Sequence, residues 1–139
     1  MAIIITVITK KWIVGVLIGY VLIILGETVL FRSPFIGQHF EPRLFWSYGA
    51  WAIQKRQIIA NVLLFIPLGF FAGRLWKWKG IIAGLGVSVV IEILQLISQR
   101  GLFEFDDILH NTLGTVIGVS IYMIVETVVI KKEEQRWTF

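Results

Sequence analysis

Two groups of polar residues interrupt long apolar stretches of this chain. Glu92 and Gln95 lie near the end of the apolar run Gly80–Ser98, and Asp107 and Asn111 begin the next run. Only a few residues separate the two runs, so these carboxylates and amides should meet where two helices meet. Carboxylates can transfer protons or bind cations, and amides beside them can hydrogen-bond a polar ligand. Ionisable groups inside a membrane are costly and by default indicate a functional site.

The composition is typical of a polytopic membrane protein. The chain has 139 residues, of which 57% are hydrophobic, and its mean hydropathy is +0.82. A soluble domain of this length could not bury so much apolar surface. The sequence contains no cysteine, which excludes disulfides, thiolate metal sites and cysteine nucleophiles. The net charge of +4 suits the headgroups of anionic membrane lipids and requires no nucleic-acid partner.

Four apolar segments are long enough to span a bilayer, which takes about 20 residues each. They cover about residues 12–31, 58–75, 80–98 and 108–130. We therefore expect an all-α, four-transmembrane-helix bundle that forms one domain over residues 1–139. The apolar strip Ala2–Thr9 is too short to span, so it either extends the first helix or lies in the interface. No cleavable signal pattern is visible, so the first segment is expected to be a retained helix.

Basic residues predict the orientation. Eight lysines and arginines flank the segments on the side of the two chain ends, and five flank them on the other side. The positive-inside rule then makes both termini cytoplasmic. Glu92 lies twelve residues into its segment, about 18 Å along a helix axis at 1.5 Å per residue, which is in the outer half of the bilayer.

The connection between the first two segments, residues 32–57, is rich in aromatic side chains. Aromatic residues with a polar edge concentrate at the level of the lipid headgroups. We therefore expect an aromatic interfacial segment with a short helix at about Leu44–Gln57. The alternative is that this connection covers the polar cluster formed by Glu92, Gln95, Asp107 and Asn111. The aromatic residues are Phe35, Phe40, Phe45, Trp46, Tyr48 and Trp51.

Helical spacing brings the polar residues to common faces at one depth. The shared faces contain Ser88, Glu92, Gln95 and Gln99 on the third segment, and Asp107, Asn111, Gly114 and Gly118 on the fourth. Asn61 and Glu27 lie at a similar depth on the other two segments. Glu92 is mid-segment, where no capping role exists, so it needs a partner: Arg100, Arg32, a proton or a bound cation.

Several of these residues also have a purely structural interpretation. Asp106 or Asp107 can cap the last helix, and Asn61 and Asn111 can join helices through hydrogen bonds. Small residues four apart allow helices to approach closely, and Pro67 should kink the second helix. The small-residue strips are Gly80, Gly84 and Ser88 on the third segment and Gly114 and Gly118 on the fourth.

The two histidines, His39 and His110, give only a weak metal signal. His110 is next to Asn111, about 100° away around a helix, so we expect it to face elsewhere. The spacing of carboxylates and histidines matches no strong metal motif. We therefore expect no metal and no other cofactor.

These motifs resemble those of the VanZ-like membrane proteins. The match covers about residues 25–120, and its combined motifs are fairly specific. The departures are modest: His110 stands where an apolar residue is usual, and Asp106 makes the acid double. The matching motifs are Phe31-Arg32, Asn61-Val-Leu-Leu-Phe-Ile-Pro67-Leu-Gly69, Ile91-Glu92-Ile-Leu-Gln95, and the separate residues Arg100, Asp107, Asn111, Gly114 and Gly118.

The resemblance implies a small, multi-pass protein of the bacterial cytoplasmic membrane. The founding member of this family is linked to resistance against the glycopeptide antibiotic teicoplanin. Carried over residue by residue, the resemblance makes the motif positions the candidate ligand-binding residues. They are Arg32, Asn61, Glu92, Gln95, Arg100, Asp107 and Asn111.

Three functions remain open, and the sequence does not decide whether the protein is an enzyme. The first is a module that binds or modifies a lipid-linked cell-wall precursor or a lipoglycopeptide at the outer leaflet, because acids beside arginines suit phosphate, amide or sugar groups. The second is a membrane-embedded enzyme on a lipid-linked substrate, with Glu92 and Asp107 as acid and base or metal ligands and Arg100 as electrostatic stabiliser. The third is an oligomeric transporter of lipids or small molecules. We rank them in this order, and the oligomeric state, a homo-oligomer included, stays open.

Overall fold

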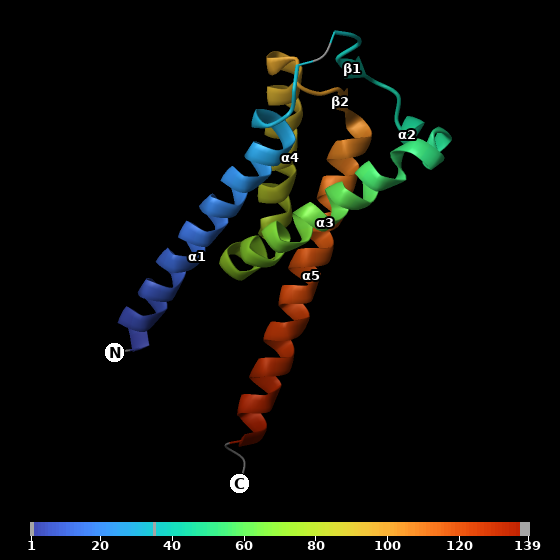
Figure 1. The fold of residues 1–139 in the computed structure, drawn as a ribbon. Helices are drawn as coiled ribbons and strands as arrows, with labels where there is room; N and C mark the ends of the chain where they lie inside the picture. The colour runs from blue at the N-terminus through green and yellow to red at the C-terminus, as the bar shows by residue number, and fades with distance from the viewer. Residues whose placement is uncertain (1, 35, 137–139) are drawn as a thin grey trace.

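The computed structural model of the chain describes residues 2–34 and 36–136, and the side chains of residues 10–34 and 36–129. It is built mainly from long helices, with one short strand pair at one end (Figure 1). The elements are α1 (Ala2–Leu25), the π-helical turn η1 (Gly26–Leu30), β1 (Phe40–Glu41), α2 (Trp46–Gly49), α3 (Trp51–Trp76), the 3₁₀ turn η2 (Lys77–Lys79), α4 (Gly80–Ser98), β2 (Phe103–Glu104) and α5 (Phe105–Arg136).

Three helical stretches of the described chain are long and apolar enough to cross a membrane. They are Lys10–Leu30, Trp51–Ser98 and Phe105–Val129. The prediction named four because the second and third predicted segments are separate in the sequence. In the structure α3 and α4 are joined through η2 into one helical stretch of 48 residues.

The predicted helix bounds hold best for α4, which covers Gly80–Ser98 as expected. The strip at residues 2–9 continues α1 rather than forming a separate element. The predicted interfacial helix Leu44–Gln57 is wrong, because only Trp46–Gly49 forms a short helix and α3 already begins at Trp51. The aromatic residues before Ile58 therefore belong partly to a membrane-length helix, whose first turns are more polar than its centre.

Close backbone contact between α3 and α5 is made possible by glycine. A Cβ on Gly69 would overlap the main chain of Thr115, and a Cβ on Gly114 or Gly118 would overlap main-chain carbonyls of Val62 or Ile66. The predicted strip on α4 is confirmed as a packing surface, since its three small residues are buried. A Cβ on Gly80 would lie 2.7 Å from the main chain of Ala72 in α3, and one on Gly84 would overlap the Thr115 side chain in α5.

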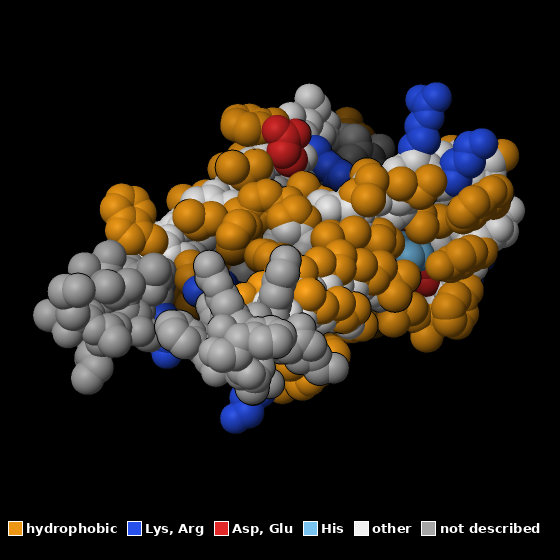
Figure 2. Space-filling view, turned by 90° about the horizontal axis from the view of Figure 1, so that it is seen from below, with side chains coloured by type: hydrophobic (Ala, Val, Ile, Leu, Met, Phe, Trp, Pro, Cys, Tyr) orange, Lys and Arg blue, Asp and Glu red, His pale blue; other side chains and the backbone are white. Residues whose placement is uncertain are grey.

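An apolar core joins α1, η1, α3 and α4. Many large apolar side chains elsewhere are exposed, and they cover most of the described face shown in Figure 2, with Lys and Arg side chains projecting from its margins. An exposed apolar surface of this extent suits lipid contact. The core side chains are Leu17, Ile24, Val29, Phe65, Leu68 and Ile91.

Both ends of the described chain lie at one end of the molecule. In Figure 1 the beginning of α1 and the end of α5 point away from the end that carries β1, β2 and the connection between η1 and α2. The polar residues predicted from the sequence gather near this second end, where α4 meets α5.

Candidate functional site

A short parallel strand pair ties the long connection after η1 to the loop between α4 and α5. Phe40 pairs with Phe103, and Glu41 pairs with Glu104. The main-chain N–H of Phe103 also donates to the carbonyl oxygen of His39, at 2.9 Å. The strand pair therefore places residues 40–50, which we call the strap, against the beginning of α5.

Asp106 fixes the strap to α5. Its carboxylate is fully buried and accepts hydrogen bonds from the main-chain N–H of Phe45 at 2.6 Å and of Ser47 at 3.0 Å. The Ser47 hydroxyl donates to the same carboxylate at 2.5 Å. N–H groups at the beginning of a helix lack partners within the helix and favour an anionic acceptor. Asp106 therefore binds the beginning of α2, which is distant in the sequence, whereas the sequence suggested a cap of the last helix.

Two aromatic residues of the strap also contact the polar cluster. The indole N–H of Trp46 donates to Glu104 Oε2 at 3.2 Å. The Tyr48 hydroxyl lies 3.0 Å from Nε2 of His110, a side chain that is only 3% exposed. His110 was predicted to face away from the cluster, and this is wrong because the strap buries the face of α5 on which it lies. These contacts support the cap that the sequence left as the alternative.

Glu92 lies beneath the strand pair and is only 1% exposed. Its Oε2 accepts a hydrogen bond from the main-chain N–H of Glu104 at 2.9 Å. Arg100 was a candidate partner of Glu92, but its Nη1 donates to the carbonyl oxygens of Leu30 at 2.6 Å and Arg32 at 3.4 Å. Arg100 therefore holds the end of η1 against the end of α4.

The buried amides join helices to one another. Gln95 Nε2 donates to the carbonyl oxygen of Thr28 at 3.1 Å, and Asn111 Nδ2 donates to the Ser88 hydroxyl at 2.9 Å. The structural role suggested for Asn111 is therefore present, and Gln95 joins α4 to η1 in the same way.

Not every predicted polar residue lies in the cluster. Asn61 is buried at 9% exposure on α3, whereas Glu27 is exposed. Gln99 is also exposed and ends α4 in the left-handed conformation, with φ of 54°. Glu27 and Gln99 are therefore not part of the candidate site.

Three buried polar atoms of the described side chains have no hydrogen-bond partner in the protein. They are Gln95 Oε1, His110 Nδ1 and Asn111 Oδ1. His110 Nδ1 lies 4.0 Å from Asp107 Oδ1. Buried polar atoms are nearly always hydrogen-bonded, so each of these positions can receive water or a polar ligand group. Within the described residues, no group of three or more His, Asp or Glu side chains is arranged to hold a metal ion.

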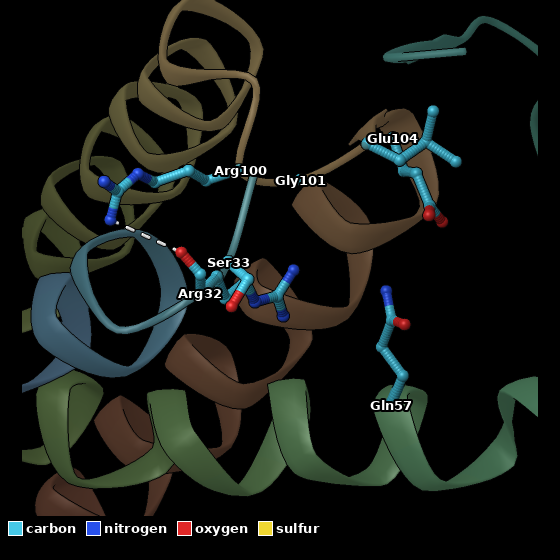
Figure 3. A pocket seen from close by; sticks show the side chains of 7 residues that line it. Arg32, Ser33, Gln57, Arg100, Gly101 and Glu104 are labelled. Atoms are coloured by element: carbon cyan, nitrogen blue, oxygen red, sulfur yellow. Dashed lines mark hydrogen bonds between the residues drawn. The ribbon is translucent and has the colours of Figure 1, made fainter. Parts of the chain in front are cut away.

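A pocket of about 330 Å³ opens beside this cluster. Figure 3 shows the Arg32 guanidinium, the Gln57 amide and the Glu104 carboxylate directed toward the same space from three different elements. Arg32 follows η1, Gln57 lies on α3 and Glu104 ends β2. The described residues that line the pocket are Arg32, Ser33, Gln57, Arg100, Gly101, Leu102 and Glu104.

Sequence reasoning predicted only part of this pocket. Of the seven predicted ligand-binding residues, Arg32 and Arg100 line it. Asp107 does not line the pocket itself but binds a residue that does, because its Oδ2 accepts a hydrogen bond from Gln57 Nε2 at 2.9 Å. Gln57 was missed, although it precedes Asn61 by four residues and so shares its helix face.

Glu104 was not among the predicted site residues, yet its side chain is buried at 3% exposure. Burial and, to a smaller extent, the nearby Asp107 carboxylate together raise the pKa of its carboxyl group to about 7, against the lowering effect of the Trp46 hydrogen bond. The carboxyl group therefore changes charge near neutral pH.

This raised pKa predicts how stability depends on pH. The free energy of unfolding should fall as pH rises from about 4.5 to about 7, because the unfolded chain releases this proton first. Below this pH range the Glu104 carboxyl group is protonated in both the folded and the unfolded state. Above it the group is ionised in both states, and the loss of stability is complete. Glu104→Gln, whose amide oxygen can still accept from Trp46, should melt higher than the parent at pH 8 and close to it at pH 4.5. Exposed Glu27→Gln is the control, and an equal effect of Glu104→Gln at both pH values would contradict the prediction.

The comparison with known proteins agrees with the resemblance of the motifs. The sequence pattern of the VanZ/LLP1 family matches residues 17–126, which include every residue of the pocket. Protein VanZ of Enterococcus faecium is 32% identical over 71 residues, which are 48% of this chain and 44% of that protein. The match thus spans less than half of that relative's length, and no solved structure is significantly similar to the chain. The family pattern covers most of the sequence, and the chain belongs to the VanZ/LLP1 family.

Proposed function

We propose that this protein binds or modifies a lipid-linked component of the cell envelope at the outer leaflet of the bacterial cytoplasmic membrane. Membership of the VanZ/LLP1 family supports a role in resistance to teicoplanin-type glycopeptides. The observation that carries the proposal is the pocket in which Arg32, Gln57 and Glu104 converge.

The proposed topology has four membrane crossings with both termini in the cytoplasm. The 26 residues of α3 and the 19 residues of α4 correspond to about 39 Å and 28 Å of helix. The hydrocarbon core is about 30 Å thick, so the stretch Trp51–Ser98 is long enough to cross twice. An even number of crossings agrees with the common end at which α1 begins and α5 ends (Figure 1). The distribution of basic residues then puts the pocket outside.

The pocket suits a ligand that carries an anionic group next to neutral polar groups. Among the described residues, the Arg32 guanidinium forms no ion pair, so its donors can engage a phosphate or carboxylate. Gln57 and Glu104 can hydrogen-bond hydroxyl or amide groups beside it. A lipid-linked cell-wall precursor or a lipoglycopeptide combines these groups with an apolar chain. Binding is favoured over catalysis because Glu92, the candidate base, is held by the Glu104 amide.

The test is Arg32→Gln, expressed in a glycopeptide-sensitive host. We expect ligand affinity to fall by on the order of tenfold or more, because hydrogen bonds to charged groups contribute about 1.5–3 kcal/mol. Protection against teicoplanin, measured as the inhibitory concentration, should fall with it. The amount of protein in the membrane should not change, since this side chain forms no ion pair within the described structure.

The matched control is Arg56→Gln, which removes an exposed arginine next to Gln57 and outside the pocket lining. It should leave protection unchanged. Full protection by an Arg32→Gln variant present at the parent level would refute the proposed role of the pocket.

A further inference from the structure

A second cavity lies at the other end of the helices, between α1, α3 and α5. Its volume is about 270 Å³. Three basic side chains come to it from separate places: Lys10 from α1, Arg74 from α3 and Lys77 from η2. Neither the sequence motifs nor the family resemblance assigned these residues a ligand.

Only one of the three cations is neutralised within the cavity. Lys77 forms an ion pair with Glu126, which also accepts a hydrogen bond from the Tyr122 hydroxyl at 2.8 Å. Arg74 Nη1 donates to that neutral hydroxyl at 3.4 Å and forms no ion pair of its own among the described residues, although Glu126 attracts its charge as well as that of Lys77. Among the described residues that line the cavity, Glu126 is the only acid, so the three basic side chains leave an excess of two positive charges.

The remaining lining is apolar, and the cavity lies where apolar segments begin or end. Ile13 and Leu75 supply the apolar walls. Lys10 and Lys11 directly precede the apolar residues 12–25 of α1, and η2 with Lys77 and Lys79 directly follows α3. A charged opening with apolar walls at this level fits a phosphate group that continues into acyl chains, whereas a free phosphate ion would gain nothing from those walls. Basic pockets between transmembrane helices are known sites for anionic lipid headgroups.

We propose that this cavity binds the phosphate headgroup of an anionic membrane phospholipid. The inference does not rest on the function proposed for the pocket at the opposite end. The bound headgroup would join α1 to the α3–α5 pair through Lys10 and Arg74.

Native mass spectrometry of the purified full chain can test this binding. Three probes are compared: phosphatidylglycerol, phosphatidylcholine with the same acyl chains, and inorganic phosphate. We expect preferential retention of phosphatidylglycerol. Arg74→Gln should weaken that retention about fivefold, the effect of one basic residue near a membrane surface. The control is Lys79→Gln, which removes an exposed lysine of η2 that does not line the cavity, and it should not change the retention.

A second variant should act in the opposite direction. Glu126→Gln removes the acid that neutralises Lys77, while its amide oxygen can still accept from Tyr122. It should therefore increase phosphatidylglycerol retention, and this result does not depend on the folding of the Arg74 variant. Equal retention of both lipids, or a loss of retention in Glu126→Gln, would overturn the proposal. Inorganic phosphate that binds with the same dependence on Arg74 would also overturn it, because the site would then take a free anion.

Discussion

Replacement of Gly118 by alanine is expected to lower the thermal stability of this protein sharply. The added Cβ would overlap the carbonyl oxygen of Ile66 and lie 2.7 Å from the main-chain nitrogen of Phe70. Both atoms belong to the backbone of α3, so no side chain can rotate away and the helices must separate. Overpacking typically destabilises by about 1–3 kcal/mol, and we expect the upper part of this range. The melting temperature in detergent and the amount of protein in the membrane are the measurements.

Gly86→Ala is the matched control for this substitution. It adds the same methyl group to a membrane-length helix, but its Cβ would meet nothing within 4 Å. Alanine also favours helix more than glycine does, so this variant should melt at the parent temperature or slightly above it. If Gly118→Ala melted like Gly86→Ala, α5 would not pack on α3 as closely as the structure describes.

The glycine contacts show what local sequence patterns could predict here. Close helix packing needs small residues at a spacing of four, so the strips on α4 and α5 are visible in the sequence itself. The structural interpretation of Asn111, an amide that joins helices through a hydrogen bond, also came from the sequence, and Asn111 does bind Ser88 of α4. The membrane class followed from composition, because apolar content alone excludes a soluble fold of this length.

The strap shows what those patterns could not predict. Asp106 binds Ser47 across 59 residues of sequence, and β1 pairs with β2 through only two residues on each strand. Neither contact produces a periodic pattern, so aromatic content alone suggested an interfacial segment. The pocket depends on the strand pair, because β2 carries Glu104. Glu104 could therefore not be assigned from sequence.

The exposed position of Glu27 has a different physical cause. Glu27 was grouped with the cluster by its depth in the first segment alone, and depth does not determine the direction of a side chain. The chain forms a π-helical turn at Gly26–Leu30, which changes the direction of each side chain relative to an α-helix. Thr28 is buried there and its hydroxyl donates to the carbonyl oxygen of Ile24, while Glu27 is exposed.

Replacement of Glu92 by glutamine is expected to preserve stability while abolishing glycopeptide protection. The Glu92 side chain is 1% exposed, and its Oε2 accepts a hydrogen bond from the main-chain N–H of Glu104. A glutamine carbonyl oxygen can accept the same bond, and the variant no longer has to bury a carboxyl group that can ionise. The melting temperature should therefore be equal or higher. We expect the charge of Glu92 to act on the ligand next to the pocket, so the inhibitory concentration of teicoplanin should fall to that of cells without the protein.

Two controls separate the loss of charge from the loss of structure. Glu27→Gln makes the same chemical change at an exposed position and should keep both stability and protection. Glu92→Ala removes the acceptor and leaves the buried Glu104 N–H unpaired, so it should destabilise by about 1–3 kcal/mol. A stable Glu92→Gln variant with full protection would exclude charge-dependent binding and acid–base catalysis by this residue. Its role would then be the hydrogen bond that holds β2 on α4, and Arg32 and Gln57 would remain as the polar groups available to a ligand.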